Sequence, residues 1–170
     1  MRKSGVHSMM KYLMTKQRLK ILVVTMALTL RAANAAAEIV PPRDVQELVK
    51  PILDLCAEAA TSQGERQNAA VWQTGKLLGV LFQMRTQASD DALVVLMNFY
   101  VGESLGEDLL HQVTVRRKRM LPLLLKYQGA HVIFSSRTYP SSLLLAPDVR
   151  RENFDDAINS VRAGKIIGED

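Results

Sequence analysis

Apolar residues recur every three or four positions along most of the chain beyond residue 40, which is the spacing of one face of an α-helix. The first such stretch begins after Pro41-Pro42 and ends in the polar segment Thr61–Gly64. Pro51 lies inside it and is expected to bend or split the helix, because proline lacks an N–H and its ring presses on the preceding turn. A second helix is predicted from about Glu65 to Gln87. The apolar face of the first helix comprises Val45, Leu48, Val49, Ile52, Leu53 and Cys56.

The middle of the chain predicts three shorter helices. Ser89 can cap the first of them, and apolar residues on more than one side continue to Val101, so we expect this helix to be buried. A second helix starts at Glu103 and is closed by the basic run Arg116–Arg119, whose charges suit the negative end of a helix. The third begins at Met120 and ends at the next glycine.

The remaining pattern predicts one extended segment and a last helix. Residues His131 to Phe134 read HVIF and indicate a short strand or an extended plug, followed by the polar loop Ser135–Ser142. A last helix is expected to begin at Pro147-Asp148 and to end at Gly164. Together the segments predict an all-α fold of about six helices. We expect stacked antiparallel helical hairpins, either as a bundle or as a short helical-repeat array.

The first 37 residues follow a different pattern, which predicts a cleavable signal peptide. Positive charges precede an apolar run from Ile21 to Leu30, small residues come next, and no acid occurs before Glu38. The run is shorter than the roughly 20 residues that a spanning helix needs, which disfavours an uncleaved anchor or an amphipathic membrane helix. Cleavage is expected near Ala35 or Ala37, leaving residues 38–170 as a single helical domain. The Ala-rich junction is typical of bacterial export, so we expect the periplasm, with secretion as an alternative.

Removal of this segment changes the charge of the protein. The whole chain carries a net charge of +5, but seven of its 22 Lys and Arg residues and none of its 17 acids lie in positions 1–37. Residues 38–170 therefore have 15 bases and 17 acids, a net charge of −2. Because the domain is mildly acidic, no nucleic-acid partner is expected, and a membrane is expected to be involved only during export.

The single cysteine of the chain, Cys56, cannot form an internal disulfide. It falls on the apolar face of the first predicted helix, so a buried, unreactive thiol is the favoured interpretation. A catalytic or partner-linking thiol is the alternative. An exported domain of this kind must be held together by packing alone.

Three residues spaced four apart could bind a metal ion. Glu103, Glu107 and His111 would line one face of a helix, close enough to share a cation. A metal site needs further ligands, and only His131 and Asp155-Asp156 could supply them. The alternative is a solvated face on which Glu107 and His111 attract each other, so no cofactor is expected.

The run Arg116–Arg119 is the densest positive charge of the mature chain, and it could contact an acidic protein partner. Four consecutive residues span about 400° of a helix, so they cannot all face one ligand, and a solvated helix end is the simpler alternative. Two residues of the loop after residue 135 join the list of possible contacts. The candidate partner-binding residues are Arg116, Arg117, Lys118, Arg119, Arg137 and Tyr139.

The chain contains no sequence motif of an enzyme that we can identify. It has no GxSxG elbow, HExxH, CxxC, EF-hand or Gly-rich phosphate loop, so no catalytic residue is assigned. The favoured hypothesis is an exported, non-catalytic helical protein that binds another protein, such as an inhibitor, an immunity protein or an envelope accessory protein. The alternatives are a small metal-dependent enzyme or metal-binding protein using Glu103, Glu107 and His111, and a carrier of an apolar ligand.

Overall fold

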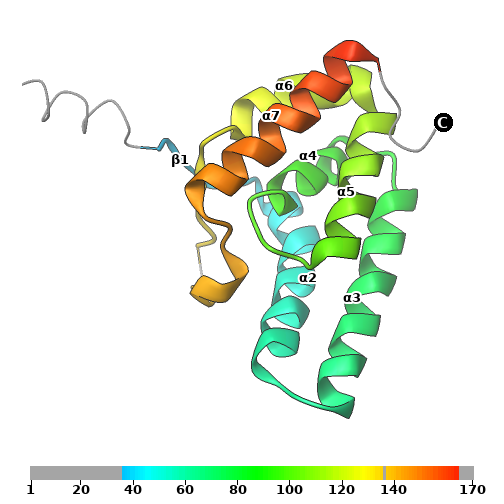
Figure 1. Cartoon of the computed structure of the whole chain (residues 1–170), viewed down its shortest axis with the longest axis vertical. Coiled ribbons are helices and arrows are strands. Elements are labelled where there is room, and N and C mark those ends of the chain that lie inside the picture. Colours follow the sequence, from blue (N-terminus) through cyan, green and yellow to red (C-terminus); the bar gives the residue numbers. More distant parts are fainter. Residues whose placement is uncertain (1–35, 136, 165–170) are drawn as a thin grey trace, which may run out of the picture. The chain divides into compact units, whose positions relative to one another are not determined.

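The computed structural model describes residues 36–135 and 137–164, so the predicted signal segment falls almost entirely outside it. The described residues form an all-α fold, which confirms the predicted class (Figure 1). Among them no helix is both long enough and apolar enough to cross a membrane. The helices of the described residues are α2 (Arg43–Thr61), α3 (Glu65–Gln83), α4 (Gln87–Leu96), α5 (Glu103–Val115), α6 (Arg117–Tyr127) and α7 (Pro147–Ala163), and a 3-10 turn, η1 (Ser141–Leu143), precedes α7.

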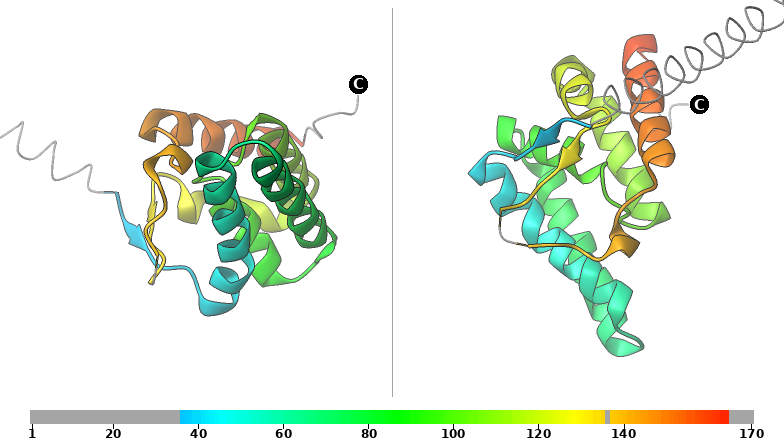
Figure 2. Two further views of the ribbon diagram at one scale, coloured as in Figure 1. Left: turned by 90° about the horizontal axis from the view of Figure 1, so that it is seen from below. Right: turned by 90° about the vertical axis from the view of Figure 1, so that its left-hand side faces the viewer.

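Helices α2 and α3 form a hairpin that extends from the rest of the domain (Figures 1 and 2). The chain reverses at Gly64, which has a φ of 63° that residues with a side chain rarely adopt. Arg66 Nε lies 2.7 Å from Glu58 Oε1 and joins the two helices near the turn. Pro51 is exposed within a continuous α2, so the expected split does not occur. Helix α3 ends at Gln83, four residues earlier than predicted.

Helix α4 is the centre of the core. Its residues Ala92–Leu96 are all fully buried, and α2, α3, α5 and α6 pack around it. Its N-cap is Thr86 rather than the predicted Ser89: Thr86 Oγ1 accepts a hydrogen bond from the Ser89 N–H at 3.2 Å, and Ser89 Oγ accepts one from the Thr86 N–H at 3.1 Å. Since one helix is surrounded by four others, the fold is a bundle and not a linear array of repeats.

Two short strands tie the start of the domain to its C-terminal half. β1 (Glu38–Ile39) pairs in parallel with β2 (His131–Val132), which confirms the predicted extended segment (Figure 2). The His131 N–H donates to the Ala37 carbonyl and the Ile133 N–H donates to the Ile39 carbonyl, each at 2.9 Å. The backbone of residues 37–39 is therefore tied into the folded domain.

Three aromatic rings fix the chain after β2 against the end of α4. The centroids of Phe99, Phe134 and Tyr139 lie 5.8–6.0 Å apart in tilted and edge-to-face arrangements. Such arrangements match the positive ring edge to the negative ring face. The Tyr100 N–H also donates to the Leu143 carbonyl at 2.6 Å, so η1 is held beside the segment that leads into α5.

Candidate functional site

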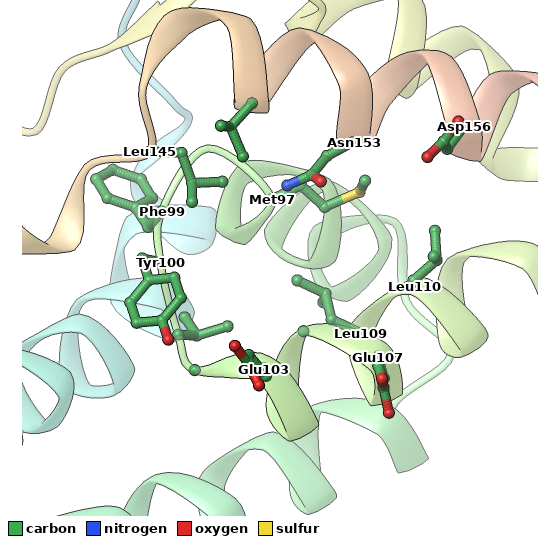
Figure 3. A pocket seen from close by; sticks show the side chains of 14 residues that line it. Met97, Phe99, Tyr100, Glu103, Glu107, Leu109, Leu110, Leu145, Asn153 and Asp156 are labelled. Carbon is green, nitrogen blue, oxygen red and sulfur yellow. The ribbon is translucent and has the colours of Figure 1, made fainter.

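A groove of about 350 Å³ lies between α5, the segment before it, and α7 (Figure 3). Gly102 precedes α5 with a φ of 90°, which turns the chain so that α5 forms one wall while α7 forms the other. Gly106 also lines the groove, and a Cβ placed there would meet no described atom within 4 Å outside its chain neighbours and the backbone of its own helix. The apolar part of the groove comprises Met97, Phe99, Val101, Leu109, Leu110, Leu145 and Val149.

The rim of the groove is acidic. Glu103 and Glu107 come from α5 and Asp156 from α7, all three are exposed, and none of the described residues that line the groove is basic. Figure 3 shows Glu103 and Asp156 on opposite sides of the opening, whereas Glu107 points away from it. Glu103 lies in the first turn of α5, where a carboxylate also suits the positive helix end. The arrangement can hold an apolar group that carries positive charge beside it.

The predicted metal-binding set is not assembled here. Glu103 and Glu107 do share a face, and Asp156 joins them at the groove, but His111 does not line it. The described residues contain no group of three or more His, Cys, Asp or Glu side chains placed to hold a metal ion. The physical reason is that Glu103 and His111 lie eight residues apart, about 12 Å along a helix, so an i, i+4 pair can share an ion but all three side chains cannot meet at one point.

Arg116, predicted as a partner contact, is buried instead. Its side chain is 1% exposed, and Nη1 lies 2.8 Å from Oδ1 of Asp90, which is 0% exposed. Arg119 Nε lies 3.1 Å from the other carboxylate oxygen, although its side chain is 44% exposed. Arg116 is therefore inaccessible to a partner, and its charge serves to neutralise a carboxylate in the core.

The basic run begins a helix rather than closing one, contrary to the prediction. Arg116 lies at the junction of α5 and α6, so Arg117 and Arg119 fall in the first turn of α6, where the helix dipole disfavours cations. The three guanidinium groups of the run reach backbone carbonyls at or just beyond the C-terminal ends of other helices, where the last carbonyls lack partners within the helix. Arg116 donates to the Phe82 carbonyl, Arg119 to the Arg85 carbonyl at 3.2 Å, and Arg117 to the Gly164 carbonyl. Arg116 and Arg117 thus hold the ends of α3 and α7, Arg119 holds the linker between α3 and α4, and Lys118 is exposed.

Arg137 and Tyr139, the other predicted contacts, both reach Asp54 on α2. Arg137 Nη1 lies 2.9 Å from Asp54 Oδ2, and the Tyr139 hydroxyl donates to Oδ1 at 3.2 Å. Burial and then the Asp54 carboxylate raise the pKa of Tyr139, so the hydroxyl stays protonated and keeps donating. Tyr139 is 8% exposed whereas the Arg137 side chain is 53% exposed. This pair anchors the loop, and of the two only Arg137 offers surface to a partner.

A second pocket of about 400 Å³ lies on the other side of the segment before α5. It is lined by α2, α3, the start of α5 and η1, and Cys56 lies in its wall. Cys56 is buried, as predicted, and burial raises the pKa of its thiol despite a Thr74 hydrogen bond that acts the other way. The thiolate, which is the reactive form, is therefore disfavoured.

The chain matches none of the protein-family models, curated proteins or solved structures with which it was compared. A proposal about function consequently depends on the groove itself. Sequence reasoning singled out Glu103 and Glu107 but missed the groove, because Met97, Leu145 and Asn153 are brought to it only by tertiary packing. The one available signal was Gly106, a glycine inside an otherwise regular helical pattern.

Proposed function

We propose that this protein is an exported, non-catalytic helical protein that binds another protein, and that the groove between α5 and α7 holds a basic, amphipathic segment of that partner. One observation carries the proposal: the carboxylates of Glu103 and Asp156 lie on opposite sides of an open apolar groove, and none of the described residues that line this groove is basic. An apolar side chain supplies contact area in such a site, while flanking Lys or Arg residues match the rim.

The two parts of the groove make different contributions. Burying one Leu-, Met- or Phe-sized side chain against the floor contributes about 1.5–3 kcal/mol. Each exposed ion pair at the rim contributes only about 0.2–1 kcal/mol, but the combined acidic field raises the association rate and excludes acidic partners. We therefore expect binding of moderate affinity that weakens as salt rises.

The β1–β2 pairing supports a particular boundary for the exported form. Cleavage after Ala37 would remove the carbonyl that accepts the His131 N–H, whereas cleavage after Ala35 would keep it. We propose that the mature protein begins at Ala36. Mass spectrometry of the N-terminal peptide from the periplasmic fraction tests this: an Ala36 start supports export and the boundary, a Glu38 start contradicts the boundary, and an intact N-terminus on cytosolic protein contradicts export.

The finer role that we propose is that of an inhibitor, an immunity protein or an envelope accessory protein. All of these bind a protein partner without turning over a substrate. The acidic rim favours a partner that presents a basic surface and disfavours an acidic one.

The test is selection of peptides from a displayed random library on the purified protein, followed by calorimetric titration of the selected peptides. We expect enrichment of sequences with an apolar residue flanked by Lys or Arg. The double variant Glu103→Gln/Asp156→Asn should weaken their binding by roughly 2- to 30-fold, corresponding to about 0.4–2 kcal/mol for two exposed pairs. Raising the salt concentration should reduce the difference between variant and wild type.

The matched control is Asp108→Asn/Glu152→Gln, which makes the same charge change on α5 and α7. Both residues are exposed, and neither lines the groove. If the two double variants weakened binding equally, the effect would be a general field effect and the groove would not be the binding site. Enrichment of acidic or purely polar peptides would also contradict the proposal.

A further inference from the structure

We propose that the partner segment that occupies the groove between α5 and α7 continues across Tyr100–Gly102 and places a second, uncharged apolar side chain in the pocket that contains Cys56. This inference rests on the proposed function and adds to it a bipartite partner sequence: one apolar anchor with basic neighbours, and one without them.

The two pockets are separated by a single stretch of chain. Tyr100, Val101 and Gly102 line both of them, with α7 beyond one side and the α2–α3 hairpin beyond the other (Figure 1). Tyr100 is 47% exposed. An exposed aromatic side chain between two apolar depressions is a typical centre of a protein-binding surface, because it offers a large contact area at a small entropic cost.

The two pockets differ in charge, and this difference indicates which partner side chain enters each of them. The groove between α5 and α7 carries Glu103, Glu107 and Asp156, whereas none of the described residues around the second pocket is charged. A Lys or Arg entering the second pocket would lose its hydration without an ionic partner, which is unfavourable. The second anchor is therefore neutral. The polar residues that line the second pocket are uncharged hydroxyl residues, Thr74, Tyr100, Ser104 and Ser142.

The spacing of the anchors follows from the thickness of the dividing segment. One layer of chain with its side chains is about 10 Å thick, and an extended peptide advances about 3.3 Å per residue. The two anchors are thus expected about three residues apart. The second pocket, like the first, lies near the lower end of the size range of small ligand sites, which suits one or two side chains.

The experiment uses peptides selected on the purified protein and one filling substitution for each pocket. Gly106→Leu projects a side chain into the acidic groove, and Ala60→Leu projects one into the second pocket. Ala69→Leu is the control, since Ala69 is exposed on α3 and lines neither pocket. For peptides with two anchors, each filling variant should weaken binding at least about fivefold and the control should not. Replacing the second peptide anchor with alanine should abolish the effect of Ala60→Leu only.

The possible results separate the inference from the function on which it rests. If Gly106→Leu weakens binding and Ala60→Leu does not, the second anchor is wrong and the acidic groove remains the site. If neither substitution weakens binding, both proposals fail. Should Ala60→Leu unfold the protein, NMR titration of the wild-type protein decides: methyl shifts at Val71 and Leu105 on peptide binding, with none at the exposed Val80, support the inference, and unshifted Val71 and Leu105 overturn it.

Discussion

Replacing Arg116 with methionine removes the guanidinium that neutralises Asp90 inside the core. Methionine keeps most of the side-chain volume, so the change isolates the charge and its hydrogen bonds. Of the two described cations that pair with Asp90, which is 0% exposed, Arg119 would remain, and its side chain is 44% exposed. The Phe82 carbonyl at the end of α3 would also lose its donor. The variant therefore leaves a buried carboxylate with one solvent-screened partner.

The expected cost follows from that geometry. Breaking a buried ion pair by removing one partner destabilises a protein by about 3–5 kcal/mol, because the remaining charge stays desolvated. For a domain of this size, that corresponds to a fall in Tm of roughly 10–18 °C. The cost is a large fraction of the 5–15 kcal/mol that typically stabilises a domain, so urea unfolding is best followed at low temperature, by circular dichroism.

Two further variants make the measurement decisive. Lys118→Met changes an exposed cation of the same run and should alter the free energy of unfolding by less than about 0.5 kcal/mol. Adding Asp90→Asn to Arg116→Met removes the orphaned charge and should restore at least about 1 kcal/mol. If Arg116→Met were as mild as Lys118→Met, the buried pair would not exist as described. If Arg116→Met weakened partner binding without lowering the free energy of unfolding, Arg116 would be a partner contact, as the sequence predicted, and not a core residue.

Three other expectations test separate features of the fold. Burial and the Asp91 carboxylate raise the pKa of Tyr127, so the unfolded tyrosine ionises first and stability falls as pH rises above about 10.0; Tyr127→Phe should reduce this fall in urea titrations between pH 10 and 11. Gly106→Ala should stabilise α5 by about 0.5–1 kcal/mol, whereas Gly164→Ala, at a φ of 67°, should cost about 1 kcal/mol; thermal unfolding distinguishes the signs. Trp72, which is 62% exposed, should fluoresce at long wavelength, and Trp72→Ala should leave Tm within a few degrees.

Local patterns in the sequence determined most of the secondary structure. The apolar spacing predicted each of the six α-helices of residues 36–135 and 137–164, since burying one face of a helix requires apolar side chains every three or four positions. Gly64, Gly102 and Gly164 adopt positive φ at helix boundaries, a conformation that a side chain would penalise. One helix boundary was predicted wrongly: Thr86 and not Ser89 is the N-cap of α4. Both residue types are good N-caps, so the sequence alone does not distinguish them, and the path of the chain after α3 decides where α4 begins.

Tertiary structure alone decided what the charged residues do. Arg116–Arg119 carry the same charge in the sequence. Arg116 and Arg119 both reach Asp90 of α4, but the Arg116 side chain is 1% exposed whereas that of Arg119 is 44% exposed. The burial of Arg116 depends on Asp90, which lies 26 residues away in the sequence. The acidic groove likewise needs Glu103 from α5 and Asp156 from α7 on opposite sides of one opening. The periodicity of apolar residues shows which face of a helix is buried, but not which other helix packs against it. The packing of the helices decides which charged side chains meet, and therefore which of them form buried ion pairs and which line the groove.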